Sequence, residues 1–280
     1  MTSSTSQVPN VTLLDGVEIP QLGFGVFQVP PEETAETVTR AFEVGYRHID
    51  TATAYQNEAQ VGEAFRASGL DRDDVFITTK CFNHDHGYDD AQKALRASLD
   101  RLELDFVDLY LIHWPVPSKD LYVETWKAFI DAQKEGLVRS IGVSNFQPDH
   151  LDRLVAETGV TPSVNQVELH PHLTQSGLVR KHHELEIATE AWSPLAQGKV
   201  LDEPAIEEIA EDVGKEPGQV VLRWHIQHGY IVFPKSVTPE RIQQNFEIFD
   251  FELSDDQISA IDDLDRGERI GPDPDTFVAP

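Results

Sequence analysis

Four side chains with complementary acid–base chemistry follow short apolar segments of the chain: Asp50, Tyr55, Lys80 and His113. A tyrosine phenol has an ordinary pKa of about 10, and a neighbouring ammonium group lowers that pKa because it stabilises the phenolate. A carboxylate can hold the ammonium in place, so Asp50, Lys80 and Tyr55 predict a proton donor that works nearer neutral pH. A neutral imidazole, such as that of His113, can hydrogen-bond a carbonyl oxygen and orient it. This chemistry suits protonation of a carbonyl oxygen while hydride arrives from a cofactor, because no side chain supplies hydride.

A basic segment near the C-terminus, Lys235-Ser-Val-Thr-Pro-Glu-Arg241, predicts an anion site. Thr238 is a favourable N-cap residue and Pro239 suits the first position of a helix. Free N–H groups at a helix N-terminus attract anions, and Lys235 and Arg241 add two positive charges. The whole chain has 49 Asp and Glu residues against 22 Lys and Arg residues, which gives a net charge of −27. A basic cluster in so acidic a chain indicates a site for an anion such as the 2′-phosphate of NADP.

The overall acidity also excludes several classes of partner. A net charge of −27 repels nucleic acid and anionic membrane surfaces, so we predict neither as a partner. No segment approaches the roughly 20 apolar residues of a membrane span, and the first nine residues do not resemble a secretory signal. The single cysteine, Cys81, excludes a disulfide framework and a cysteine-based zinc site. We therefore expect a monomeric, cytoplasmic protein whose partner is a small molecule.

Short apolar segments alternate with amphipathic helical segments along most of the chain. The predicted strands are 22–26, 47–50, 74–79, 106–112, 138–143, 163–168, 186–191 and 230–233. The predicted helices are 32–44, 58–67, 89–102, 121–134, 148–157, 175–182, a helical region within 202–228, and 239–249. Alternating strands and helices imply a parallel sheet. Eight strand–helix pairs in a chain of this length favour an α/β fold of the (β/α)8 TIM-barrel type over a doubly wound sheet.

Further elements are predicted at both ends of the barrel. Residues 12–14 and 17–19, on either side of Asp15-Gly16, predict an N-terminal β-hairpin that closes the bottom of the barrel. A helix at 254–263 precedes a Gly- and Pro-rich C-terminal tail, 267–280, which we expect over the active-site mouth. We predict a disordered tail at 1–9 and a single barrel domain at 10–280.

Functional side chains of such barrels come from the C-terminal ends of the strands. The polar or aromatic residues expected at that mouth are Asp50, Tyr55, Lys80, His113, Asn145, Glu168, Trp192 and Lys235. Each residue alone has a structural explanation, because a strand-end Asp often caps the next helix and a single His is more often structural. Their recurrence at the ends of successive strands indicates a shared site.

Several motifs resemble those of the aldo-keto reductase family. They are Gly45-Tyr-Arg-His-Ile-Asp-Thr-Ala52 with Tyr55, Glu58 and Gly62, then Leu109-Tyr-Leu-Ile-His-Trp-Pro115, Gly142-Val-Ser-Asn-Phe146 and Lys235–Arg241. The motifs occur in the family's order, and the resemblance covers nearly the whole chain after residue 10. It implies a carbonyl reductase that uses NADPH without a Rossmann fold.

The resemblance also implies a role for each matching residue. Tyr55 would be the general acid, with Lys80 as the partner that lowers its pKa. Asp50 would hold Lys80, and His113 would orient the carbonyl group. The residues implied for the cofactor are Ser144, Asn145 and Gln166 at the carboxamide, Trp192 on the nicotinamide ring, Ser193, Pro194 and Leu195 along the pyrophosphate, and Lys235, Ser236, Val237, Arg241 and Asn245 at the adenosine phosphate.

Within the family, the segments Glu190–Gly198 and Arg269–Pro274 resemble bacterial 2,5-diketo-D-gluconate reductases. Many family members have Trp two residues after the catalytic Lys, whereas this chain has Phe82, and many have Tyr or Phe where Trp192 stands. An apolar substrate wall is expected from Phe27, Phe82 and Trp114. Such a wall suits small aldehydes and dicarbonyls as well as a keto-sugar acid.

Two alternatives from other functional classes stay open at this point. A metal-assisted barrel hydrolase or isomerase would use the His pairs His84/His86 or His170/His172, although neither pair has an obvious carboxylate partner, so we predict no metal site. A non-catalytic NADP-binding protein would have the same fold, although such proteins often lack one of the four catalytic residues.

Overall fold

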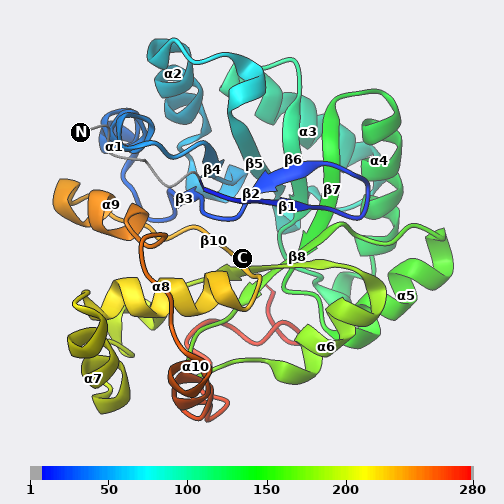
Figure 1. The fold of residues 1–280 in the computed structure, drawn as a ribbon. Coiled ribbons are helices and arrows are strands. Elements are labelled where there is room, and N and C mark those ends of the chain that lie inside the picture. Colours follow the sequence, from blue (N-terminus) through cyan, green and yellow to red (C-terminus); the bar gives the residue numbers. More distant parts are fainter. Residues whose placement is uncertain (1–7, 279–280) are drawn as a thin grey trace.

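The computed structural model describes residues 8–278 and confirms the predicted (β/α)8 barrel (Figure 1). Eight parallel strands pair in the order β10-β9-β8-β7-β6-β5-β4-β3. A parallel bridge between Leu22 and Val232 joins the two outermost strands and closes the barrel. The strands are β3 (Phe24–Gly25), β4 (His48–Asp50), β5 (Phe76–Cys81), β6 (Val107–Ile112), β7 (Val138–Ser144), β8 (Val164–Glu168), β9 (Ala188–Trp192) and β10 (Ile231–Val232).

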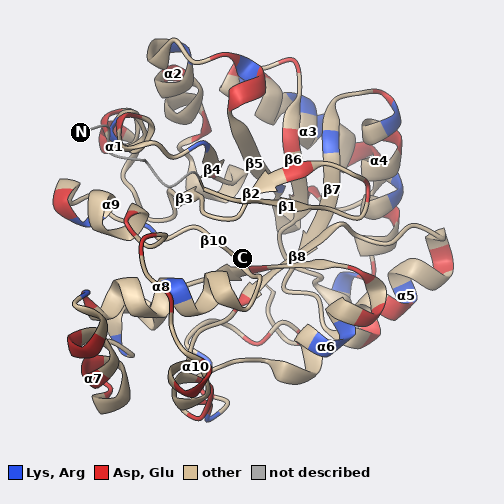
Figure 2. Cartoon of the chain, viewed as in Figure 1, with Lys and Arg blue, Asp and Glu red and all other residues tan. Residues whose placement is uncertain are grey.

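Helices follow the strands and surround the barrel. They are α1 (Pro31–Val44), α2 (Glu58–Ser68), α3 (Tyr88–Leu102), α4 (Tyr122–Lys134), α5 (Pro148–Thr158), α6 (Ser176–Leu185), α7 (Pro204–Val213), α8 (Pro217–Gln227), α9 (Pro239–Phe246) and α10 (Asp255–Asp262). Acidic side chains are spread over the outer helices, for example α7 and α10 (Figure 2). Among the described residues, no helix has the length and apolar character that crossing a membrane requires.

The helical region predicted within 202–228 consists of two helices. Gly214 ends α7 with a φ of 66°, a left-handed conformation that glycine adopts without a Cβ penalty. Glu216 and Gln219 then form a capping box, and Pro217 occupies the first turn of α8. The local sequence therefore divides the region into two helices, because Gly214 ends α7 and Glu216 caps the start of α8.

The predicted hairpin closes the bottom of the barrel. Strands β1 (Asn10–Thr12) and β2 (Glu18–Pro20) pair antiparallel. The first strand begins two residues earlier than predicted and the second begins one residue later. In Figure 1 this hairpin lies across the end of the barrel. Leu13 and Ile19 are buried against the inward side chains of the barrel strands, such as Leu109. Burial of these two side chains gives the short hairpin the hydrophobic support that an isolated hairpin lacks.

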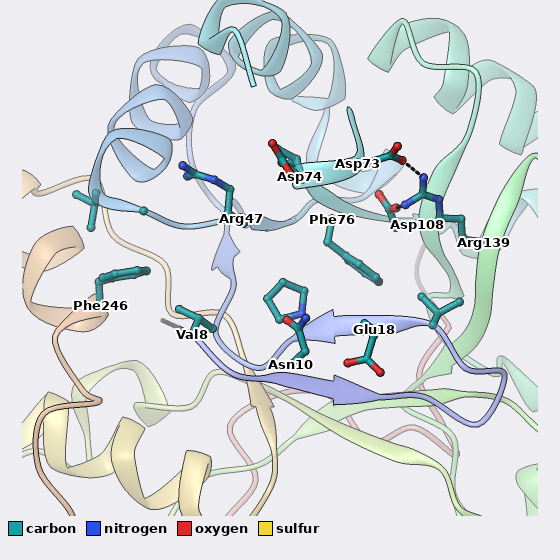
Figure 3. A pocket seen from close by; sticks show the side chains of 15 residues that line it. Val8, Asn10, Glu18, Arg47, Asp73, Asp74, Phe76, Asp108, Arg139 and Phe246 are labelled. Atoms are coloured by element: carbon teal, nitrogen blue, oxygen red, sulfur yellow. Dashed lines mark hydrogen bonds and ion pairs between the residues drawn. The ribbon is translucent and has the colours of Figure 1, made fainter. Parts of the chain in front are cut away.

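A cavity of about 860 Å³ lies at the same end, between the hairpin and the N-terminal ends of the strands (Figure 3). Arg139 contacts Asp73 there, and its Nη1 lies 3.1 Å from Oδ1 of Asp108. None of the predicted site residues lines this cavity. It therefore lies away from the strand ends that hold the predicted chemistry.

The described part of the chain begins and ends on opposite sides of the barrel, because Val8 lies beside the hairpin and Phe277 contacts Trp114 after β6. Of the predicted disordered tail, residues 1–7 lie outside the described residues, whereas Val8 packs against the core and the Pro9 carbonyl accepts a hydrogen bond from the Gln21 N–H at 2.9 Å. Val8 and Pro9, which the sequence assigned to that tail, therefore make contacts with the rest of the fold. At the other end, the tail after α10 lies over the C-terminal ends of β8 and β9, where the N–H groups of Ile270 and Gly271 donate to the Glu168 carboxylate. Residues 279–280 lie outside the described residues.

Candidate active site

Three of the predicted catalytic side chains form one hydrogen-bonded chain. Lys80 is fully buried within β5, and its Nζ donates to Asp50 Oδ1 at 2.6 Å and to Tyr55 Oη at 3.4 Å. The third ammonium proton reaches the Thr51 carbonyl oxygen at 2.9 Å, a contact that the sequence did not predict. Every ammonium proton is therefore used, which holds Lys80 in one position between the carboxylate and the phenol.

Burial and charge act in opposite directions on these groups. Burial raises the pKa of Tyr55, Lys80 lowers it, and Asp50 raises it again, so that the pKa lies above its ordinary value. This corrects the expectation of a lowered pKa: in the protein without cofactor or substrate, desolvation of the phenolate outweighs attraction by the ammonium. Burial alone disfavours the Lys80 ammonium, but Asp50 and Tyr55 bring the pKa of Lys80 above its ordinary value. Lys80 is therefore charged and Tyr55 carries its proton at neutral pH.

His113 lies beside this chain, directly after β6. Its ring is 5.8 Å from the Tyr55 ring, measured between centroids, and 5.8 Å from the Phe82 ring. Burial, followed by the charge of Lys80, holds the pKa of His113 well below its ordinary value. The imidazole is thus neutral, as a group that donates a hydrogen bond to a carbonyl oxygen must be if it is not to compete as the acid.

The residues predicted at the carboxamide lie at the C-terminal end of β7 and within β8. Asn145 has a left-handed backbone with a φ of 63°, which Asn tolerates better than most residues. Its Nδ2 donates to the His113 carbonyl and to Ser144 Oγ, and its Oδ1 accepts a hydrogen bond from Trp192 Nε1 at 2.9 Å. Gln166 donates to Asp50 Oδ2 at 2.9 Å. These bonds link the predicted carboxamide residues to both Asp50 and His113.

A groove of about 670 Å³ runs away from this mouth. Its lining includes these predicted residues: Phe27, Ser193, Pro194, Leu195, Lys235, Ser236, Arg241 and Asn245. Phe27 connects the groove to the catalytic group, because its ring lies 5.0 Å from the Tyr55 ring between centroids. In the described part of the chain, neither Lys235 nor Arg241 forms an ion pair. Two uncommitted cations in so acidic a protein are available to an anion in the groove.

The structure differs from prediction in two details of the basic segment Lys235–Arg241. The Thr238 side chain makes no capping bond to α9; instead the Thr238 N–H donates to Ser236 Oγ at 3.1 Å. Pro239 does occupy the first turn of α9, as predicted. Val237 is 42% exposed and does not line the groove.

The predicted substrate wall gains a residue from the C-terminal tail. Trp114 is buried, and its ring lies 4.4 Å from the Phe277 ring between centroids. Sequence reasoning missed Phe277, because the contact joins positions far apart in the chain. The available signal was an aromatic residue in an otherwise Gly- and Pro-rich tail.

The Glu168 carboxylate accepts hydrogen bonds from the backbone of the C-terminal tail and so holds it next to Trp192. Its Oε1 accepts from the Ile270 N–H at 2.6 Å and from His170 Nε2 at 3.0 Å, and its Oε2 accepts from the Gly271 N–H at 2.9 Å. Any side chain at Gly271 would meet Trp192, since an added Cβ would lie 2.3 Å from Cη2 of the indole. Glycine therefore permits the tail backbone to lie directly against the aromatic ring.

The second of the two His pairs, His170/His172, has carboxylate partners in the fold. His170 bonds to Glu168, and His172 Nε2 lies 2.6 Å from Glu203 Oε1. Among residues 8–278, no three His, Cys, Asp or Glu side chains are arranged to hold a metal ion.

Comparison with known proteins agrees with this geometry. The family model described as "Aldo/keto reductase family" matches residues 21–266. The chain is 52% identical to a methylglyoxal reductase DkgA of Escherichia coli, over 95% of this chain and 97% of that protein. An aldo/keto reductase structure from Brucella melitensis has a TM-score of 0.90 at 54% identity, covering 92% of this chain and all of that one. A variant of Gox0644 in complex with NADPH has a TM-score of 0.95 at 45% identity, covering 98% of this chain and all of that one. The chain therefore belongs to the aldo/keto reductase family.

Proposed function

We propose that this protein reduces aldehydes and ketones with NADPH, with Tyr55 as the general acid. The observation that carries the proposal is the hydrogen-bonded chain from buried Asp50 and Lys80 to the half-buried Tyr55, which lies beside a neutral His113 at the mouth of the barrel. Family membership supports the reaction class, and the related structures in complex with NADPH or NADP support the cofactor.

The polar residues at the mouth of the barrel have separate roles in the proposed reaction. The neutral His113 imidazole donates a hydrogen bond to the carbonyl oxygen and orients it. NADPH supplies hydride when bound. Tyr55 gives its phenolic proton to the oxygen as negative charge develops there, and the charged Lys80 stabilises the phenolate that is left. Asp50 holds the ammonium in place, so that the positive charge stays beside the phenol.

The groove fits the cofactor in chemical character and position. Lys235 and Arg241 would hold the 2′-phosphate, assisted by Ser236 and Asn245. Ser193, Pro194 and Leu195 would line the pyrophosphate, and Trp192 would stack on the nicotinamide ring. Ser144, Asn145 and Gln166 would bind the carboxamide.

Small dicarbonyls such as methylglyoxal, other aldehydes, and keto-sugar acids such as 2,5-diketo-D-gluconate are the proposed substrates. The name of the Escherichia coli relative supports the first of these. Three aromatic contacts support an apolar wall around the polar centre: Phe27 lies against Tyr55, Phe82 against His113, and Trp114 against Phe277. NADPH-consumption assays with these three substrate types would rank them. A monomeric state and a cytoplasmic location stay predictions, which light scattering and cell fractionation would check.

Replacing Tyr55 by Phe tests the central step. The variant keeps the ring but loses the proton, so we expect turnover to fall about 100-fold or more while the Kd for NADPH, measured by fluorescence, stays near that of the parent. Tyr88→Phe is the matched control, because its hydroxyl donates to Asp131 on the outer surface. Full activity of the Tyr55 variant would refute the assignment.

A further inference from the structure

A fourth strand contributes a buried carboxyl group to the catalytic chain. Glu190 lies in β9, fully buried, directly opposite Gln166 of β8 in the strand register, and Gln166 lies opposite Ser144 of β7. These three residues therefore form one row across the inner wall of the barrel, just below Trp192. The reaction proposed above gives Glu190 no role.

Gln166 lies between two carboxyl groups. Its Nε2 donates to Asp50 Oδ2 at 2.9 Å and to Glu190 Oε2 at 2.8 Å. An amide nitrogen has two protons, so both are committed. The network thus extends from Tyr55 through Lys80, Asp50 and Gln166 to Glu190, and the last four of these residues are buried.

This arrangement determines which way the Gln166 amide faces. A rotated amide would turn its Oε1 toward the Asp50 carboxylate, which repels it, and would leave that buried acceptor without the Gln166 donor. The observed orientation leaves Oε1 as the one polar atom of Gln166 that is free to bind a ligand. Oε1 is an acceptor, and its complement on a nicotinamide is the N–H of the carboxamide.

Glu190 meets this need in either protonation state, because Oε2 accepts a hydrogen bond as part of a carboxylate or as the carbonyl of a neutral acid. Burial, followed by the charge of Asp50, raises the pKa of Glu190 to about 8. If Glu190 were ionised, two negative charges, on Glu190 and Asp50, would lie near the single positive charge of Lys80. The neutral form of Glu190 avoids this excess of negative charge. A neutral acid is therefore the compatible partner for Gln166 at this depth.

We propose that Glu190 is a positioning residue that holds the Gln166 amide in the orientation in which Oε1 accepts the carboxamide N–H of NADPH. This inference rests on the proposed function, because it takes the carboxamide to lie at Gln166. Glu190 touches neither cofactor nor substrate and acts through Gln166.

The test compares two cofactors across two variants. NADPH has the carboxamide N–H, whereas its 3-acetylpyridine analogue has a methyl group there and keeps the carbonyl. Glu190→Leu removes the acceptor at similar volume, and Glu190→Gln keeps a neutral acceptor. If Leu at this position prevents folding, Glu190→Met, whose unbranched side chain adapts to irregular space, replaces it.

We expect Glu190→Leu to weaken NADPH about 5- to 10-fold, the size of one net hydrogen bond, and to change the Kd of the analogue less than about twofold. Glu190→Gln should bind both cofactors like the parent protein. Equal losses of both cofactors in Glu190→Leu, or a loss in Glu190→Gln as large as in Glu190→Leu, would overturn the positioning role alone. A parent protein that binds both cofactors equally would overturn the placement of the carboxamide at Gln166, and this inference with it.

Discussion

Because its pKa is raised, Glu190 should make the folded protein less stable as pH rises. Replacing Glu190 by a residue that does not titrate should remove this dependence on pH. The pKa of Glu190 is about 8 in the folded protein and 4.5 as its ordinary value. Between these pH values the folded protein holds a proton that the unfolded chain has released, so the free energy of unfolding falls as pH rises. One pKa unit is worth about 1.4 kcal/mol. The carboxyl group therefore removes about 3 kcal/mol of stability between pH 5 and pH 7.5.

Glu190→Gln abolishes this titration while keeping an acceptor for Gln166. Relative to the parent protein, the variant should gain about 3 kcal/mol of unfolding free energy between pH 5 and pH 7.5. Urea unfolding at half-unit pH intervals and constant ionic strength measures the difference. Other titrating groups cancel in the comparison, because both proteins contain them. If the two stability curves run parallel over this range, Glu190 does not titrate as the structure indicates.

Glu168→Gln is a matched control on the neighbouring strand, because the pKa of Glu168 is shifted in the opposite direction from that of Glu190. Burial alone raises the pKa of Glu168, but hydrogen bonds from His170 and from the N–H groups of Ile270 and Gly271 bring it below its ordinary value. Its carboxylate therefore stabilises the fold above the ordinary value of 4.5, and this contribution is lost as pH falls through the folded pKa. We expect Glu168→Gln to cost about 1.5–3 kcal/mol at neutral pH, with a constant difference from pH 5 to pH 7.5.

Two further variants test the cofactor groove and the tail. Arg241→Ala should weaken NADPH about 10- to 100-fold and NADH much less, because only NADPH has the 2′-phosphate; titration of both cofactors checks this, and equal losses would contradict the phosphate role. Gly271→Ala should destabilise the protein by about 1–3 kcal/mol and alter tryptophan fluorescence, because the new Cβ would lie 2.3 Å from Cη2 of Trp192. Gly177→Ala is its control, since an added Cβ there meets nothing within 4 Å; similar thermal unfolding of both Ala variants would count against the tail contact.

Much of the fold could be predicted because its signals are local. Apolar segments of strand length alternate with amphipathic helices, and residues such as Gly45 and Pro239 mark a helix end and a helix start. Even the two-helix region after β9 has its break at Gly214 in the printed sequence. The N-terminal boundary was less predictable, because Pro9 accepts its hydrogen bond from Gln21 and not from a residue adjacent in sequence.

The candidate site was predictable to the extent that strand order alone brings its residues together. Asp50, Lys80 and His113 lie at or near the C-terminal ends of successive strands, so a closed parallel barrel necessarily collects them at one mouth. The contact of Phe277 with Trp114 depends instead on the course of an irregular tail. Glu190 was overlooked as a partner of Gln166 because the hydrogen bond depends on the register of two strands, which sequence periodicity does not specify.

The sequence by itself therefore determined the barrel and the family, and it supplied the proposed reacting groups, because these follow from periodicity, residue type and motif order. The tertiary structure alone decided how those groups ionise. Lys80 was expected to lower the pKa of Tyr55, yet burial of the phenol outweighs that attraction. Glu168 and Glu190 are chemically identical and lie on adjacent strands, yet donors from the tail lower the pKa of one, whereas burial beside Asp50 raises that of the other. Desolvation and hydrogen-bond partners are properties of the folded interior, and no local sequence pattern encodes them.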